Sequence, residues 1–154
     1  MNNHWLERTE LLIKQQGLNT LQKAHILIVG LGGVGSFAAE FIARAGVGSL
    51  TIVDGDCVSL SNINRQLPAL HSTVGKNKTD VMAARLLDIN PALNLTVINE
   101  FLSPERAWDI VTPDYDYVID CIDSITPKLN LILSSKRKRV KIVSCMGAGG
   151  ATDV

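Results

Sequence analysis

The chain has 154 residues, and its 15 Lys and Arg balance its 15 Asp and Glu, so that its formal net charge is zero. This length is typical of one domain with its own hydrophobic core. A content of 46% hydrophobic and 19% charged residues excludes an intrinsically disordered protein. The charge balance also excludes a uniformly basic nucleic-acid-binding chain, although it leaves room for a local basic patch.

Three cysteines, Cys57, Cys121 and Cys145, are an odd number and form no C-x-x-C pair. This pattern argues against a disulfide scaffold and against a four-cysteine zinc site in this chain. No apolar run approaches 18 residues, and the first ten residues lack the apolar part of a secretory signal. We therefore expect a cytoplasmic protein without an integral membrane segment.

The first half of the chain predicts helices and buried strands in alternation. Apolar residues from Val34 to Ala45 recur with helical spacing and predict one apolar helix face. Continuous apolar runs, by contrast, are typical of parallel strands that are buried on both faces. The predicted elements are a helix over residues 5–16 that breaks at Gly17, a helical turn over 18–23, a strand over 25–30, a helix over 34–45 and a strand over 49–54.

The second half continues the alternation after a long ordered loop over residues 55–75, a length that is usually functional. A further helix is expected to start with Thr126 as N-cap and Pro127 as first residue, with Ile125, Leu129, Ile132 and Leu133 as its apolar face. The other predicted elements are helices over 76–90 and 104–111 and strands over 95–98, 117–122 and 141–144.

This order of elements predicts an α/β fold, a Rossmann-like, mostly parallel sheet with helices on both faces. The chain stops soon after its last predicted strand and the glycines of residues 147–150, and no closing helix follows. We therefore expect residues 1–154 to form one nucleotide-binding domain at the N-terminal end of a longer chain.

A glycine-rich motif lies between the first predicted strand and the first long helix. Gly30, Gly32, Gly33 and Gly35 match G-x-G-x-x-G in the strand–turn–helix context that phosphate binding requires. Asp54 ends the second strand, 24 residues after Gly30, where a carboxylate can bind a ribose hydroxyl. The motif predicts a nucleotide site without distinguishing NAD from ATP.

Polar residues beyond the motif favour a nucleotide with more phosphate charge. Arg65 and Lys78 carry the charges that bind phosphate oxygens, unless both are solvated surface cations. Asn62 and Gln66 offer neutral hydrogen bonds.

Two carboxylates, those of Asp120 and Asp123, lie at the carboxyl end of the fourth predicted strand, the side of such sheets on which ligands bind. Asp123 is our candidate for Mg²⁺, since phosphate-bound Mg²⁺ needs only one or two carboxylates.

Five separated motifs, GLGGVG, VDGD, SNINRQ, VGKNK and IDCIDS, occur in one order. Together they resemble the ubiquitin-activating-enzyme-like family of ATP-dependent adenylyltransferases. Within it, LSNINRQLPAL, STVGKNKTDVMAARLLDINP and DYVIDCIDSITPKLNLI look like the bacterial tRNA threonylcarbamoyladenosine dehydratases. The resemblance implies an adenylation domain that uses ATP and Mg²⁺.

The resemblance also implies roles for individual residues. A carboxylate attacks the α-phosphorus of ATP, and the enzyme mainly positions groups and neutralises phosphate charge. Arg8 would reach into the ATP site of a partner subunit, which implies a homodimer, unless it is an exposed helix arginine. The other implied roles are ribose binding for Asp54, packing under the nucleotide for Gly32 and Gly33, triphosphate binding for Asn62, Arg65, Gln66 and Lys78, and Mg²⁺ binding for Asp123.

The acceptor substrate stays open at this point. The first hypothesis is dehydration and ring closure of threonylcarbamoyladenosine in tRNA, and the alternative is adenylation of the C-terminal glycine of a ubiquitin-like sulfur-carrier protein. An NAD-binding oxidoreductase domain and a non-enzymatic nucleotide sensor are further hypotheses. We assign no catalytic cysteine, and we expect Cys121 and Cys145 in the core. The basic residues of 136–141 are either a solvated helix end or a contact for the tRNA backbone.

Overall fold

The structure, a computed structural model, describes residues 4–146. Its centre is a parallel sheet of five strands in the order β3-β2-β1-β4-β5. The predicted α/β, Rossmann-like fold is therefore confirmed. The strands are β1 (His25–Val29), β2 (Ser49–Val53), β3 (Asn94–Ile98), β4 (Tyr117–Asp120) and β5 (Lys141–Ser144).

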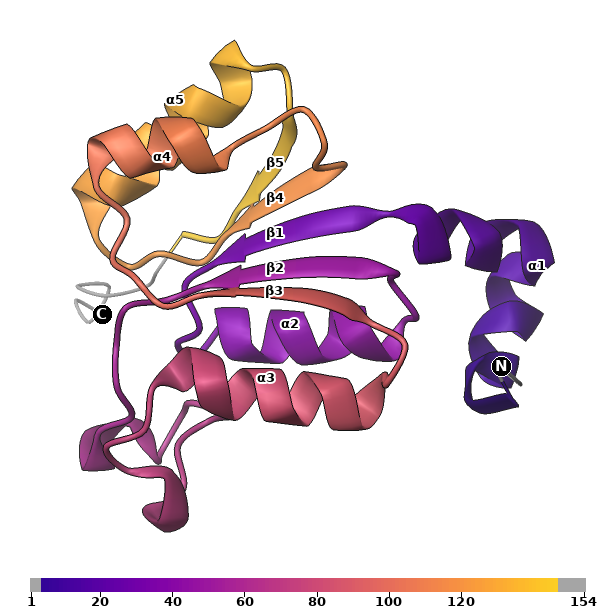
Figure 1. The fold of residues 1–154 in the computed structure, drawn as a ribbon, viewed down its shortest axis with the longest axis horizontal. Helices are drawn as coiled ribbons and strands as arrows, with labels where there is room; N and C mark the ends of the chain where they lie inside the picture. Colours follow the sequence, from indigo (N-terminus) through magenta and orange to yellow (C-terminus); the bar gives the residue numbers. More distant parts are fainter. Residues whose placement is uncertain (1–3, 147–154) are drawn as a thin grey trace, which may run out of the picture.

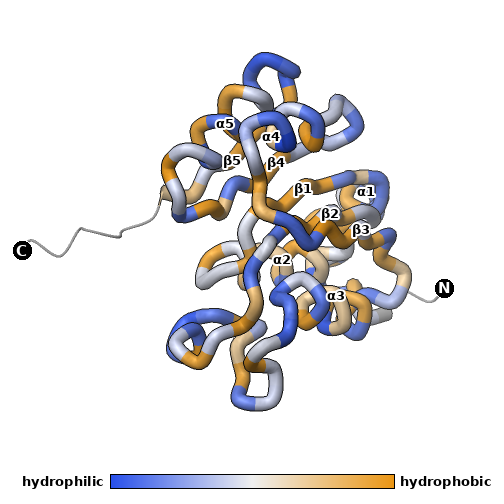
Figure 2. The backbone as a smooth tube through the Cα atoms, turned by 60° about the vertical axis from the view of Figure 1, so that its left-hand side comes forward, coloured by the Kyte–Doolittle hydropathy of each residue, from blue (hydrophilic) through white to orange (hydrophobic). Residues whose placement is uncertain are grey.

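Helices cover both faces of the sheet, as Figure 1 shows. On β1, Ile26 and Ile28 pack into the core beneath α2 and α3, and Leu27 and Val29 pack into the core beneath α4 and α5. In Figure 2 the strands are therefore largely apolar in colour, whereas several connecting loops are hydrophilic. The covering helices are α2 (Gly35–Arg44) and α3 (Lys78–Ile89) on one face, and α4 (Pro104–Ile110) and α5 (Ile125–Arg137) on the other.

The N-terminal helix α1 (Glu7–Lys23) follows a 3₁₀ turn, η1 (His4–Leu6), and lies beyond the amino-terminal ends of the strands (Figure 1). The predicted break at Gly17 was wrong. The chain bends at Lys14, whose φ is 62°, and Gly17 stays helical. A Cβ on Gly17 would lie 2.8 Å from the Cβ of Ile13, so this glycine serves side-chain packing within the helix.

The apolar face predicted for α2 is not the face that the sheet covers. Its buried residues are small, with Ala39 and Ala43 among them, while Phe37 and Phe41 are exposed. Small residues let the helix approach the sheet closely, so hydrophobicity alone pointed to the wrong face.

A similar correction applies to α5. Its N-cap is Ser124 rather than Thr126, so Pro127 is the third helical residue, where the backbone still needs no intrahelical donor. Lys128 and Leu131 are buried there, whereas the predicted apolar residues Ile125, Leu129 and Leu133 are exposed.

The long loop between β2 and α3 is ordered, as predicted, and contains two 3₁₀ turns, η2 (Leu60–Asn62) and η3 (His71–Thr73). Val58 closes it by donating its N–H to the Lys76 carbonyl oxygen at 2.8 Å and accepting from Gly75 at 2.9 Å. Within residues 4–146, no helix is long and apolar enough to cross a membrane.

Candidate functional site

A cavity of about 770 Å³ opens at the carboxyl ends of the strands. β1 pairs with both β2 and β4, so the chain reverses its strand order there, and open α/β sheets bind ligands at such a point. The structure brings predicted site residues from five separate segments to this cavity. They are Gly30, Gly32, Gly33, Asp54, Asn62, Arg65, Gln66, Lys78 and Asp123.

The glycine-rich turn is shaped by close backbone contacts. Gly30 has a φ of +94°, and a Cβ there would lie 2.7 Å from the Cys121 carbonyl oxygen. Gly35 does not line the cavity but is buried beneath the turn, where a Cβ would lie 1.7 Å from the Gly30 carbonyl oxygen. Both glycines therefore allow the N-terminus of α2 to reach the cavity, an arrangement that favours phosphate binding.

Hydrogen bonds hold the Asp54 carboxylate against this turn. Its Oδ2 accepts the Leu31 N–H at 2.6 Å, and its Oδ1 accepts the Asp56 N–H at 2.8 Å. Each carboxylate oxygen retains a further acceptor position, which suits a ribose hydroxyl.

The two predicted cations differ in their surroundings. Lys78, the first residue of α3, is buried, and its Nζ lies 2.8 Å from Oδ2 of Asp56. Arg65 is exposed and donates to the Ser61 carbonyl oxygen and to Asn64, each at 3.0 Å, rather than to a carboxylate. The Lys78 ammonium has three donors and Arg65 has five, so both can also reach an anion in the cavity.

The neutral predicted residues flank these cations. Oδ1 of Asn62 accepts the Ser59 N–H at 3.0 Å. The Gln66 Oε1 is buried without a hydrogen-bond partner among the described residues, and its side chain lies beside Gly32. Such an orphaned polar atom costs about 1–3 kcal/mol, so Gln66 fits a cavity that is completed by a polar ligand.

Asp123 lies exposed in the turn between β4 and α5 and lines the cavity. Residues 4–146 contain no group of three or more His, Cys, Asp or Glu that could hold a metal ion. A single carboxylate beside a phosphate site nevertheless fits Mg²⁺, which usually keeps water and phosphate ligands.

Several cavity residues were missed by the sequence analysis. Asp56 lies just beyond β2, and Glu100, Phe101 and Leu102 follow β3. The Phe101 ring crowds Gly55, where a Cβ would lie 2.7 Å from ring carbons, and 73% of Phe101 is exposed. The rule that ligands bind at the carboxyl ends of strands is the signal that could have found these residues.

The cysteine prediction needs a correction, because Cys121 and Cys145 are half-buried and line the cavity instead of the core. Burial, and then the neighbouring Cys145, raises the pKa of the Cys121 thiol to about 12. A thiol with this pKa is neutral at physiological pH. Cys57 is exposed.

Arg8 is the one predicted site residue that lies far from the cavity. It belongs to α1, beyond the opposite ends of the strands (Figure 1). Its role in the site of a partner subunit therefore stays a prediction.

Comparisons with known proteins agree with this fold and site. The chain is 46% identical to the tRNA threonylcarbamoyladenosine dehydratase of Haemophilus influenzae over 92% of its length and 54% of the relative. It is 38% identical to the molybdopterin-synthase adenylyltransferase of the same organism, with coverages of 83% and 51%. The chain thus spans little more than half the length of these relatives.

A solved structure is similar over almost the whole chain. The tRNA N6-threonylcarbamoyladenosine dehydratase of Escherichia coli in complex with ATP superimposes with a TM-score of 0.93 at 42% identity, covering 97% of this chain and 62% of that one. The sequence model of the ThiF family matches residues 6–154. The chain therefore belongs to the ThiF family.

Proposed function

We propose that this chain binds ATP with Mg²⁺ and activates a carboxylate by adenylation. The observation that carries the proposal is the cavity, which combines a glycine turn at a helix N-terminus, an oriented ribose acceptor in Asp54, and two cations, Arg65 and Lys78. The E. coli relative with the same fold was solved with ATP and with AMP.

For the intact protein, the proposed acceptor is threonylcarbamoyladenosine in tRNA. The relatives of highest identity named above support this choice, since they are tRNA threonylcarbamoyladenosine dehydratases. The reaction has two steps: a carboxylate oxygen bonds to the α-phosphorus as pyrophosphate leaves, and a nitrogen of the same modified nucleoside then attacks the acyl carbon as AMP leaves. The nucleoside thereby loses one water.

The residues of the chain act mainly by position and charge. The amides of the glycine turn and the Asp54 carboxylate fix the nucleotide, so that its α-phosphorus faces the acceptor. Arg65 and Lys78 stabilise the negative charge that moves onto the leaving pyrophosphate. Asp56 holds the Lys78 ammonium in place before the nucleotide binds.

Asp123 would hold Mg²⁺ through one carboxylate. When bound, this ion neutralises charge on the phosphate oxygens, a contribution that the cations of the chain supplement.

The active unit is a cytoplasmic homodimer in this proposal, with Arg8 completing the site of the partner subunit. Exposed apolar side chains on two helices, Leu11 and Leu12 on α1 and Phe37 and Phe41 on α2, support an interface between copies. Equilibrium sedimentation of the intact protein tests it, and an active monomer would contradict it.

The test of the activity uses the intact protein with Mg²⁺–ATP and tRNA that carries threonylcarbamoyladenosine. The proposal expects an ATP-dependent loss of 18 Da, one water, from the nucleoside. Lys78→Ala and Arg65→Ala should each lower the rate by about 10²–10³-fold. Lys76→Ala is the matched control, because this exposed lysine is close to Lys78 in the sequence and does not line the cavity.

No mass change would contradict the tRNA substrate. If ATP–pyrophosphate exchange then required a ubiquitin-like sulfur-carrier protein, the adenylation would stand and the acceptor would be that carrier.

A further inference from the structure

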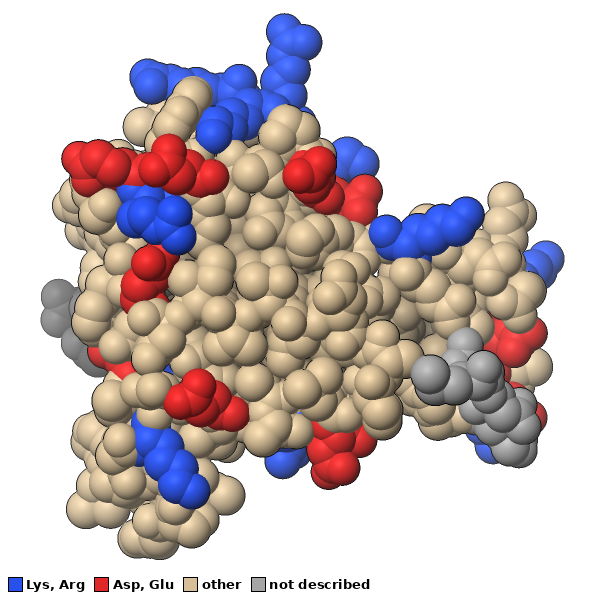
Figure 3. Space-filling model, viewed as in Figure 1, with Lys and Arg blue, Asp and Glu red and all other residues tan. Residues whose placement is uncertain are grey.

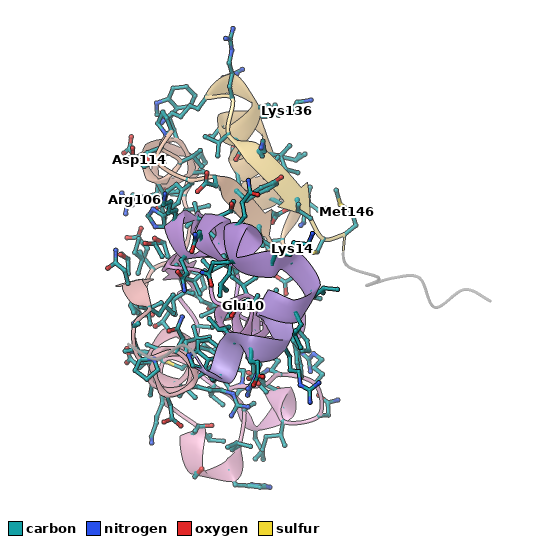
Figure 4. The ribbon with its side chains drawn as sticks, turned by 90° about the vertical axis from the view of Figure 1, so that its right-hand side faces the viewer. Glu10, Lys14, Arg106, Asp114, Lys136 and Met146 are labelled. Atoms are coloured by element: carbon teal, nitrogen blue, oxygen red, sulfur yellow. The ribbon has the colours of Figure 1, made fainter. Side chains whose placement is uncertain are left out.

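Basic residues gather at the end of α5. Five of the 15 Lys and Arg of the chain lie within residues 136–141, called the basic segment below. Of these, Lys136, Arg137, Arg139 and Lys141 are exposed, and within residues 4–146 none of them lies within 4.0 Å of a carboxylate oxygen. Figure 3 shows basic side chains along the top edge of the molecule, above α4 and α5, and Figure 4 shows Lys136 there.

Two aromatic rings lie within the same surface. The Nζ of Lys138 is 4.3 Å from the centre of the Trp108 ring, and that of Lys141 is 5.1 Å from the centre of the Tyr117 ring. Trp108 is 45% exposed and Tyr117 is 40% exposed as whole residues, so each keeps solvent-accessible surface although a lysine lies over its ring. Cations combined with accessible aromatic rings are what nucleic-acid-binding surfaces use for backbone and bases.

The end of α5 has an unusual backbone conformation at one of these basic residues. Arg139 has a φ of 59°, a left-handed conformation at a helix end where glycine is usual. A left-handed conformation at a residue other than glycine costs on the order of 1–3 kcal/mol, and the residue at this position is an arginine.

Helix α5 connects this surface to the cavity. Its N-cap Ser124 lines the cavity, and its 13 residues end within the basic segment. At 1.5 Å per residue the helix is about 20 Å long. That length corresponds to roughly six phosphates at the spacing of about 3.4 Å along one nucleic-acid strand.

We infer that the basic segment, with Trp108 and Tyr117, binds the sugar–phosphate backbone of the tRNA while the modified nucleotide occupies the cavity. This inference rests on the proposed function, because it assigns a second contact to the same substrate. The contact is electrostatic and independent of base sequence, so its strength depends steeply on salt.

The experiment measures the affinity of the intact protein for tRNA between about 50 and 200 mM salt, a range over which phosphate contacts make the affinity fall steeply. Lys136→Gln together with Arg137→Gln should lower the slope of log affinity against log salt by about 1.4–1.8, which is 0.7–0.9 for each lost phosphate contact. The KM for tRNA should rise, whereas kcat at saturating tRNA and the KM for ATP should not change.

The matched control is Lys14→Gln with Lys23→Gln, which removes two exposed charges from α1. Figure 4 shows that Lys14 lies well away from Lys136. The control pair should leave the salt slope and the KM for tRNA unchanged. All variants should unfold at the temperature of the wild type, since the altered side chains are exposed.

An unchanged salt slope and tRNA KM in the Lys136/Arg137 variant, with an active wild type, would overturn the inference and leave the proposed function intact. The inference would also be overturned if the Lys136/Arg137 variant bound an acidic carrier protein more weakly while its tRNA binding stayed unaltered. A wild type that does not dehydrate the tRNA would instead refute the proposed function, and the inference with it.

Discussion

A buried ion pair next to the cavity carries the prediction with the largest effect. Nζ of Lys128 lies 2.6 Å from Oδ2 of Asp120 and 2.9 Å from the Cys145 carbonyl oxygen. The same carboxylate accepts the Ser144 hydroxyl at 2.5 Å and the Ile122 N–H at 3.0 Å. The pair therefore joins the start of α5 to the ends of β4 and β5. The turn that carries Asp123 lies between β4 and α5. We predict that Lys128→Met strongly destabilises the protein.

The magnitude follows from burial. The Asp120 side chain is 0% exposed and that of Lys128 is 9% exposed, so solvent hardly screens the pair. Removal of one partner from such a pair costs about 3–5 kcal/mol, because the other charge stays buried without compensation. For a chain of this size each kcal/mol lowers Tm by roughly 2–4 °C, so the expected decrease is about 6–20 °C.

Urea and thermal unfolding of the intact protein measure this effect. Lys128→Met with Asp120→Asn should recover much of the loss, since no unpaired charge then remains. Lys136→Met, at an exposed position on the same helix, should stay within about 0.5 kcal/mol of the wild type. If Lys128→Met also stayed within that range, the pair would be hydrated in solution and the reasoning would be refuted.

Three further outcomes are expected. In urea titrations, Gly30→Ala should lower the free energy of unfolding by more than Gly75→Ala. Both glycines have a positive φ, but only Gly30 lacks room for a Cβ. Equal losses of stability would contradict this prediction. Phe101→Ala should weaken ATP binding in a calorimetric titration, since the exposed ring lines the cavity, and unchanged affinity would exclude a contact. Desolvation lowers the pKa of His25 below 6.5, so only the unfolded chain takes up a proton as the pH decreases through 6.5. The free energy of unfolding should therefore fall over this pH range. His25→Gln should flatten the pH dependence of the urea midpoint.

The parts of the fold and site that the sequence predicted depend on local signals. Continuous apolar runs identified the strands, and the glycine motif together with Asp54 identified segments that line the cavity. These signals suffice because strand, turn and helix N-terminus follow one another directly in the chain, from His25 to Gly35.

The features that escaped prediction depend on which residues the fold brings into contact. The helical spacing predicted Phe37 in the core, but Phe37 is exposed. Helix α2 packs closely on the sheet through alanine and glycine instead. The burial of Lys128 could not be predicted from the sequence pattern. Its partners Asp120 and Cys145 lie 8 and 17 residues away, and they contact it only because α5 packs over β4 and β5. The helical period predicted an apolar face, yet the buried face of α5 contains this lysine because the strand ends supply a carboxylate and a carbonyl. Charge burial of this kind follows from tertiary structure, so a pattern along one element cannot reveal it.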